Sequence, residues 1–235
     1  MLSVIIPVYN EELTIREVIE KVFEVPIEKE IIIVDDGSTD RTAEILEQEK
    51  DKINIIYNSL INIGKGAAVR IGLEHAKGDV VILQDGDLEC NPEEYPEILN
   101  PIIEGKADVV YGSRFMKKEG RKNTSLANYL ANKFLSGLTN ILYGANLSDM
   151  ETAYKAFKTE VIKKIKLKSL GFEIEPEITA KLLRLGYKIK EVPISYHPRR
   201  IKEGKKIGFM DGIKSIYCLF KYRLCPMKEI GNEII

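Results

Sequence analysis

Strand-like and helix-like segments alternate along the first half of the chain, and this order restricts the fold more than any other feature. Short runs rich in β-branched residues are separated by longer runs with apolar residues at helical spacing. Parallel strands need such crossovers, so the alternation favours a mostly parallel sheet covered on both faces. We therefore expect an α/β fold, with strands at residues 2–7, 30–34, 54–57, 80–84 and 108–111 and helices at 11–23, 39–48, 65–76 and 92–105.

Polar residues mark the expected starts of these helices. Asn10 is placed to cap the first helix, with acidic residues in its first turn. Ser38, Thr39 or Asp40 can cap the second helix in the same way.

The second half of the chain has longer helices and fewer strands. We expect helices at 125–143, 176–185 and 209–222 and strands at 153–157 and 188–194. The first of these helices has an apolar stripe at helical spacing, which we expect to belong to the core. A lipid-facing groove is the alternative role for this stripe. Its residues are Leu126, Leu130, Phe134, Leu138 and Ile141.

Charge and cysteine content exclude several classes of protein. The 35 basic and 36 acidic residues leave a net charge of −1, so the whole chain has no field that favours nucleic acid. Cys90, Cys218 and Cys225 form neither a disulfide framework nor a C-x-x-C metal motif, which fits a reducing cytosol. No leader is recognised at the start, and no uncharged apolar run is long enough to cross a bilayer. We expect a soluble or peripheral protein.

Acidic side chains gather where three of the expected strands end. The carboxyl ends of parallel strands face one crevice, so we expect these acids to share a site. Two carboxylates one residue apart can hold a hard divalent cation such as Mg²⁺ or Mn²⁺, and the cation can clamp a diphosphate. No G-x-G-x-x-G or Walker sequence follows the first strand, which argues against NAD-type and P-loop binding. The residues are Tyr9 and Glu11, Asp35 and Asp36, and Asp85 and Asp87 on either side of Gly86.

These ordered motifs resemble the family 2 glycosyltransferases of the GT-A type, most closely the polyprenyl-phosphate hexosyltransferases that include dolichol-phosphate mannose synthase. The resemblance covers about residues 1–215. It implies a single compact Rossmann-like domain with a nucleotide-sugar-binding half at residues 1–112 and an acceptor-binding half at 113–207. The second half includes a basic lid loop, and residues 208–235 form an amphipathic helix and tail.

The resemblance also implies a role for individual residues. Asp85, Gly86 and Asp87 hold the diphosphate and the metal, with Glu89 as a third metal ligand where archaeal members tend to have glutamine. Arg114 and Lys133 hold the acceptor phosphate. The nucleoside contacts are implied to be Pro7, Tyr9, Glu11, Val34 and Asp36, and the donor diphosphate is also gripped by Arg200 and Lys206.

Further segments can be interpreted either as part of the functional site or as purely structural. Lys65 in the segment Asn62-Ile63-Gly64-Lys65-Gly66 is placed to face phosphate, although this segment also suits a plain loop before a helix. The family has an acid near Asp149 that lies by the sugar. Glu173, Glu175 and Glu177 stand at a helix start, where the helix dipole alone explains them.

The implied reaction is an inverting transfer of a hexose, with mannose favoured, from GDP-mannose to a polyprenyl or dolichyl phosphate. Catalysis is assigned to Asp87, Arg114, Arg200 and Lys206, which stabilise the leaving group and hold the acceptor. A phosphate acceptor is already anionic, so no strong base is needed. Basic residues at 117–122 and 199–206 and the last helix predict docking on the cytoplasmic face of a membrane.

Alternative readings stay open. The same fold can use UDP-glucose or another UDP-sugar, or a glycan hydroxyl acceptor that needs an acid near Asp149 as base. A phosphate-receiver domain is disfavoured, because receivers are about half this length and have their acid pair after the first strand. A silent nucleotide-binding module is disfavoured by the intact set of Asp85, Asp87, Arg200 and Lys206.

Overall fold

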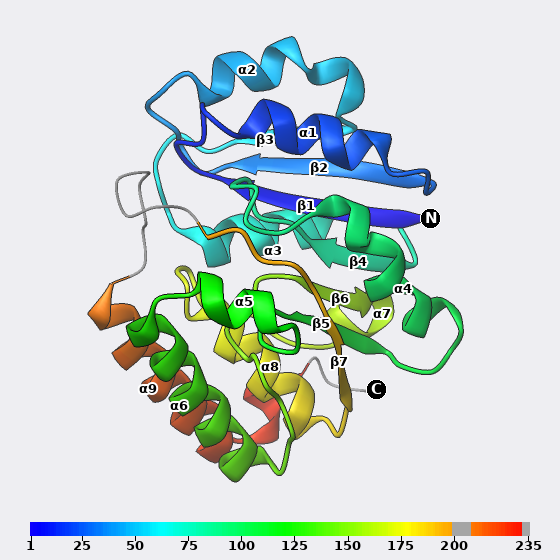
Figure 1. Cartoon of the computed structure of the whole chain (residues 1–235). Helices are drawn as coiled ribbons and strands as arrows, with labels where there is room; N and C mark the ends of the chain where they lie inside the picture. Colours follow the sequence, from blue (N-terminus) through cyan, green and yellow to red (C-terminus); the bar gives the residue numbers. More distant parts are fainter. Residues whose placement is uncertain (199–207, 232–235) are drawn as a thin grey trace.

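The computed structural model describes residues 1–198 and 208–231 of the chain. Their central element is a seven-stranded sheet in the order β3-β2-β1-β4-β6-β5-β7 (Figure 1). β6 runs antiparallel to its neighbours β4 and β5, and the other strand pairs are parallel, which confirms the predicted sheet. The strands are β1 Leu2–Val8, β2 Lys29–Asp35, β3 Ile55–Asn58, β4 Val80–Leu83, β5 Val109–Ser113, β6 Lys155–Lys158 and β7 Ile189–Pro193.

Helices cover both faces of the sheet, because β1 is apolar on both sides. Val4 and Ile6 pack with α1, α2 and α4, whereas Ile5 between them packs with α3, α7 and α8. The helices of these layers are α1 Ile15–Glu24, α2 Thr42–Gln48 and α4 Tyr95–Ile103 on one face, and α3 Lys65–His75, α7 Thr159–Ile162 and α8 Ile174–Arg184 on the other. Short 3₁₀ helices lie at Lys50–Lys52, Pro92–Glu94 and Met227–Glu229.

The first two helices begin later than the capping pattern predicts. Asn10 has a positive φ of 53°, and its side chain accepts from the backbone N–H of Thr39 at 2.7 Å instead of capping α1. Ser38 Oγ donates to Asp35 Oδ1 at 2.6 Å. The prediction that Asn10 caps the first helix was therefore wrong, because these side chains join the loops that follow β1 and β2.

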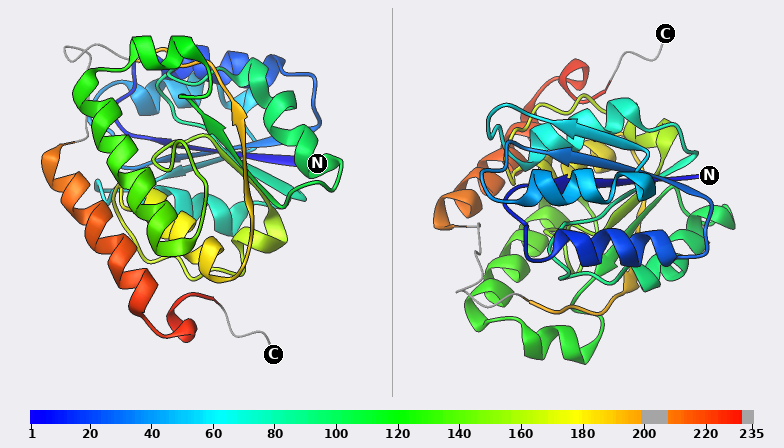
Figure 2. Two further views of the ribbon diagram at one scale, coloured as in Figure 1. Left: turned by 60° about the horizontal axis from the view of Figure 1, so that its bottom comes forward. Right: turned by 90° about the horizontal axis from the view of Figure 1, so that it is seen from above.

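A further layer is formed by α6 (Leu126–Tyr143) and α9 (Phe209–Leu224), which lie side by side against α8 (Figures 1 and 2). Leu135 of α6 and Leu219 and Tyr222 of α9 are buried between them. α5 (Lys118–Asn123) precedes α6, where the sequence predicts a basic loop. None of the helices in the described ranges has the length and apolar character needed to cross a bilayer.

The prediction that the apolar stripe of α6 belongs to the core was wrong for four of its five residues, and only Leu138 is partly buried against the cluster between α6 and α9. Phe134 is 60% exposed and Ile141 is 83% exposed, and Leu126 and Leu130 are exposed as well. The buried face of α6 consists of Asn132, Leu135, Ser136 and Thr139. The helix is turned this way because Asn132 donates to Asp149 and Ser136 accepts from the backbone N–H of Met150, while Leu135 packs against α9.

The sheet is continuous across the predicted division into two halves. β5 spans residues 109–113, and it pairs with β6 and β7, while β6 also pairs with β4. The division at residue 112 is thus a predicted change of role within one sheet.

Candidate active site

The loops that follow β1, β2 and β4 meet at one edge of the sheet. β1 lies between β2 and β4 in parallel register, so the three strands end side by side. The backbone N–H of Asp36 donates to Val8 O at 2.8 Å. Thr14 Oγ1 donates to Gly86 O at 2.7 Å, which joins the first loop to the one after β4. The acidic segments named from the sequence therefore lie in one region.

At the end of β2, Asp36 anchors the loop before α3. Its two carboxylate oxygens accept from the backbone N–H groups of Ile63 at 2.9 Å and Gly64 at 2.7 Å. Glu11 is buried, and Pro7 and Tyr9 lie half-buried at the rim. Val34 is fully buried within β2. The nucleoside roles of these residues stay predictions.

Asp85 and Asp87 follow β4 directly. Asp85 Oδ1 lies 2.7 Å from Lys65 Nζ, and the same ammonium lies 3.1 Å from Glu175 Oε1. Asp87 is nearly buried, and its Oδ1 accepts from the backbone N–H of Glu89 at 3.1 Å. Lys65 thus ties α3 to both the strand edge and the start of α8.

These carboxylates fit a divalent cation that is shared with a substrate. Mg²⁺ is commonly bound by one or two carboxylates together with substrate phosphates, which matches the pair Asp85 and Asp87. The ammonium of Lys65 at Asp85 indicates that this position attracts a positive charge. In residues 1–198 and 208–231 no three acidic, histidine or cysteine side chains lie close enough to share a metal ion. Glu89, predicted as a third ligand, accepts from the Tyr196 hydroxyl at 3.0 Å.

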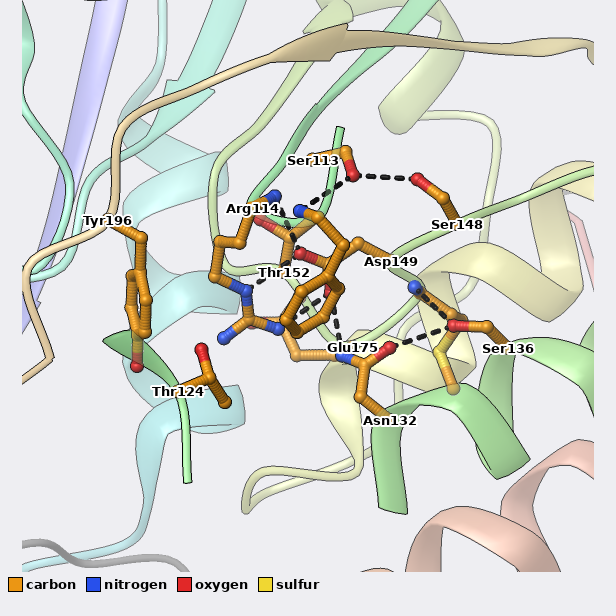
Figure 3. Close-up of polar contacts among 12 residues, drawn as sticks. Ser113, Arg114, Thr124, Asn132, Ser136, Ser148, Asp149, Thr152, Glu175 and Tyr196 are labelled. Atoms are coloured by element: carbon orange, nitrogen blue, oxygen red, sulfur yellow. Dashed lines mark hydrogen bonds and ion pairs between the residues drawn. The ribbon is translucent and has the colours of Figure 1, made fainter. Parts of the chain in front are cut away.

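Beyond β5, Arg114 and Asp149 form a buried, two-pronged ion pair (Figure 3). Arg114 Nε lies 2.7 Å from Asp149 Oδ2, and Arg114 Nη2 lies 2.7 Å from Oδ1. Burial alone would raise the pKa of Asp149, but the charge of Arg114 and its hydrogen bonds hold this pKa below the ordinary value. The centroid of the Tyr196 ring lies 5.2 Å from the guanidinium carbon of Arg114. Arg114 directly follows β5, so the ion pair lies at the end of this strand, and the charges of its two members match.

Asn132 is a site residue that the sequence reasoning missed. Its Nδ2 donates to Asp149 Oδ1 at 2.6 Å, and Ser136 Oγ donates back to Asn132 Oδ1 at 2.9 Å. The spacing of Asn132, Ser136 and Asn140 at four-residue intervals was an available signal, because such residues share one helix face. Lys133, the residue predicted to bind acceptor phosphate, is exposed on the neighbouring side of α6, and its role stays a prediction.

The acids near α8 have separate partners. Glu177 pairs with Lys181 at 2.6 Å and accepts from the backbone N–H of Ser169 at 2.7 Å, which holds the loop before the helix. Glu175 pairs with Lys65 and also with the fully buried Lys155. The pairing of Lys155 with Glu175 was not predicted from the sequence, because nothing in the spacing links the two residues.

Among the described titratable groups of this region, Glu151 has the pKa that is shifted furthest toward neutral pH. Its Oε1 is buried and, in the part of the chain that the structure describes, has no hydrogen-bond partner. Burial raises the pKa of Glu151 to about 7, although the nearby charge of Lys155 opposes this shift. A carboxyl group with such a pKa can carry or accept a proton at neutral pH.

Arg200 and Lys206, the predicted diphosphate ligands, lie outside the described residues, as does the basic loop that contains them. Their roles stay predictions.

Comparison with known protein families identifies the family of this chain. Residues 3–166 match the family model described as Glycosyl transferase family 2. The chain belongs to glycosyltransferase family 2. The resemblance inferred from the strand-end motifs is thus confirmed, and the protein is a glycosyltransferase enzyme.

Curated relatives of this glycosyltransferase cover nearly the whole chain. An uncharacterized protein of Methanocaldococcus jannaschii is 30% identical over 94% of this chain and 91% of its own length. The low-salt glycan biosynthesis hexosyltransferase Agl6 of Haloferax volcanii is 32% identical over 92% of this chain. A dolichol-phosphate mannosyltransferase of Pyrococcus furiosus is 30% identical over 94% of this chain. The chain spans only 52% and 64% of the length of the last two proteins.

Solved structures share the fold. Glucosyl-3-phosphoglycerate synthase from Mycobacterium tuberculosis in complex with UDP superposes with a TM-score of 0.75 at 20% identity, over 96% of this chain and 81% of that one. The same enzyme with Mn²⁺, UDP-glucose and phosphoglyceric acid gives a TM-score of 0.74 at 22% identity, over 96% and 80% of the two chains. This likeness confirms the GT-A fold of the family 2 glycosyltransferase.

Proposed function

We propose that this glycosyltransferase moves a hexose, with mannose favoured, from a nucleotide sugar to a polyprenyl phosphate and inverts the anomeric centre. Two of its relatives are named as a dolichol-phosphate mannosyltransferase and a glycan-biosynthesis hexosyltransferase, which supports a hexose donor and a lipid-linked acceptor. GDP-mannose is the favoured donor and dolichyl phosphate the favoured acceptor.

The observation that carries the proposal is an exposed apolar surface beside the site. α6 contacts Asp149 through Asn132 and presents large apolar side chains on its other side. We call this surface, together with its continuation on α9, the α6/α9 apolar face. A group of large exposed apolar side chains on neighbouring helices typically marks a contact with lipid or protein. Its residues are Leu126, Leu130, Phe134 and Ile141 of α6 and Met210, Ile213, Tyr217, Phe220 and Leu224 of α9.

Cations border the α6/α9 apolar face and favour an anionic membrane as its partner. The two helices carry four basic residues against one acidic residue, Asp211, although the whole chain is close to neutral. Each basic residue near an anionic leaflet contributes about 1 kcal/mol of attraction. The surface therefore supports a peripheral position on the cytoplasmic face of a membrane, where a polyprenyl phosphate is accessible. The basic residues are Lys133, Lys214, Lys221 and Arg223.

In the proposed reaction, Asp85 and Asp87 would hold Mg²⁺ or Mn²⁺ beside the donor diphosphate. A bound cation would supply positive charge to the leaving nucleoside diphosphate. Arg200 and Lys206 add to this stabilisation from the second half of the chain. Solved structures of glucosyl-3-phosphoglycerate synthase in complex with UDP and either Mn²⁺ or Mg²⁺ are consistent with a divalent cation.

The acceptor phosphate lies against Arg114, whose orientation is fixed by Asp149. A guanidinium already paired on one edge retains N–H donors on its other edge, so it can bind phosphate without moving. The phosphate oxygen then attacks the anomeric carbon from the face opposite the leaving group, which inverts that centre. The anionic acceptor needs no proton acceptor, and His75 and His197 have no part in the step.

A second candidate is transfer from UDP-glucose, or another UDP-sugar, to a hydroxyl group. Glu151, whose Oε1 is buried, favours it, because a carboxyl group with a pKa of about 7 suits removal of a hydroxyl proton. In that case Glu151 takes the proton while the hydroxyl oxygen forms the new bond.

A transfer assay with two donors and two acceptors tests the proposal. GDP-[¹⁴C]mannose or UDP-[¹⁴C]glucose is offered with dolichyl phosphate in detergent or with a soluble phosphorylated acceptor, in the presence of Mg²⁺ or Mn²⁺. We expect label in the organic phase from GDP-mannose and dolichyl phosphate, and its loss in Asp87→Ala. A water-soluble product from UDP-glucose alone would select the second candidate. Near-normal transfer by Asp87→Ala would reject the proposed metal and leaving-group chemistry.

A further inference from the structure

The residues before and after Lys65 in the sequence pack closely against the backbone of the loop before α8. Lys65 is the first residue of α3 and lies between Gly64, with φ of 123°, and Gly66. A Cβ at Gly64 would come within 2.3 Å of Leu170 O, and one at Gly66 within 2.6 Å of Ser169 O. The loop before α8 therefore presses directly on this segment and fixes where the Lys65 side chain begins.

The Lys65 ammonium joins a row of alternating charges. It lies 2.7 Å from Asp85 Oδ1 and 3.1 Å from Glu175 Oε1, and Lys155 pairs with the other oxygen of Glu175. The Lys65 side chain is only 13% exposed. The two ammonium and two carboxylate groups balance, so Asp85 has its charge matched without a metal ion.

A divalent cation at Asp85 has to compete with this ammonium. Both ions would lie against one carboxylate, in a partly buried place where like charges repel more strongly than in water. Glu175 offers the ammonium a second partner, and the donor diphosphate offers further negative charge to both cations. Metal and ammonium can therefore be accommodated together once the diphosphate is present.

We propose that Lys65 neutralises Asp85 in the donor-free enzyme and thereby makes tight metal binding depend on the nucleotide diphosphate. The inference rests on Asp85 and Asp87 being metal ligands, as in the proposed function. It gives the Asn62-Ile63-Gly64-Lys65-Gly66 segment a specific task, which is to suppress metal binding to the empty site.

Mn²⁺ binding tests this inference without any transfer reaction. Mn²⁺ is titrated into the full chain and the free ion is followed by electron paramagnetic resonance, with and without GDP or UDP. We expect weak binding without nucleotide, and about tenfold tighter nucleotide-free binding in Lys65→Gln, in the usual range of coupling between two sites. Lys65→Arg keeps the charge and is expected to bind as weakly as the unmodified chain. The coupling between Mn²⁺ and nucleotide should shrink in Lys65→Gln by the same factor.

The outcomes separate this inference from the function on which it rests. If Lys65→Gln and the unmodified chain are both folded, as judged by circular dichroism, and bind Mn²⁺ with equal affinity, the proposed role of Lys65 is overturned. The metal assignment is not affected by this result. Nucleotide-free binding by the unmodified chain that is as tight as binding with GDP would overturn the role of Lys65 as well, even if Lys65→Gln does not fold. Unchanged Mn²⁺ binding in Asp85→Asn and Asp87→Asn would instead overturn the metal assignment itself.

Discussion

Arg114 and Asp149 face each other through two parallel N–H···O contacts of 2.7 Å, although 35 residues separate them in the chain. The backbone N–H of Arg114 donates to the same carboxylate at 2.9 Å. Glu191 of β7 in turn accepts from the backbone N–H groups of Ser148 and Asp149. The position of the predicted phosphate-binding arginine is thus set by three separate segments of the second half of the chain.

Breaking this pair is expected to damage both stability and transfer. Asp149→Asn keeps the shape of the side chain but leaves the Arg114 charge without its buried partner, which typically costs about 3–5 kcal/mol. Transfer should fall by about a hundredfold, a usual loss for a displaced charge-stabilising group. Urea unfolding and initial rates measure the two effects.

Lys133→Ala is the matched control for this variant, because Lys133 is exposed one residue beyond Asn132. It should change the free energy of unfolding by less than about 0.5 kcal/mol. If Lys133 also binds the acceptor, its loss should raise the KM for polyprenyl phosphate. An Asp149→Asn enzyme as stable and as active as the unmodified chain would contradict the role given to the ion pair.

The glycines around Lys65 give a second prediction. Gly64→Ala should destabilise the fold by on the order of 3 kcal/mol, because the added Cβ meets Leu170 O and the φ of 123° is strained for any other residue. Gly137→Ala, in the middle of α6 with open space around it, should instead stabilise the fold by up to about 1 kcal/mol. Thermal unfolding of both variants checks the contrast, and a loss of equal size in both would refute it.

The sequence alone was sufficient to predict the strands that are defined by a local run of residues. The buried strands β1, β2 and β4 are runs of β-branched residues, and the acids that follow them must meet at one edge once the strands are parallel. The predictions for Asp36 and Asp85 needed no more than this order along the chain.

Contacts between residues that are far apart in the sequence could not be predicted from residue spacing. Lys65 meets Glu175 across 110 positions, and Asn132 reaches Asp149 from a helix whose apolar stripe suggested the opposite orientation. An apolar stripe predicts that a surface is covered, but it does not say whether protein or lipid covers it. The apolar stripe of α6 was mistaken for core for this reason.

Glu151 predicts a specific dependence of stability on pH. Its pKa of about 7 in the folded chain lies above the ordinary value of 4.5, so the folded chain holds this proton more tightly than the unfolded chain. The resulting stability is complete below about pH 4.5 and is lost as the pH rises to 7 and beyond.

Glu151→Gln removes this loss, because the amide stays neutral. Its free energy of unfolding should match that of the unmodified chain near pH 4.5 and exceed it at pH 8 by on the order of 2 kcal/mol. Glu160→Gln, on the exposed side of α7, should change stability equally at both values. Urea unfolding at the two pH values measures the difference. The same increment at pH 4.5 and pH 8 would show that Glu151 is not the group responsible.

The α6/α9 apolar face predicts binding to vesicles. Phe134 and Tyr217 are 60% and 68% exposed on neighbouring helices, so Phe134→Ser and Tyr217→Ser remove apolar area without opening the core. Each should weaken binding to vesicles that contain phosphatidylserine by about tenfold, since burying such a side chain is worth roughly 1.5–3 kcal/mol. The free energy of unfolding should stay within about 0.5 kcal/mol.

Ile103→Ser controls for the loss of an exposed apolar side chain elsewhere, because Ile103 lies on α4 and is 70% exposed. It should leave vesicle sedimentation unchanged. Raising the salt concentration should weaken the binding of the unmodified chain, because the basic residues around the face are screened. If Ile103→Ser reduced sedimentation as much as Phe134→Ser, the membrane would have no preference for this face, and the exposed residues of α6 and α9 would have to be explained by another partner.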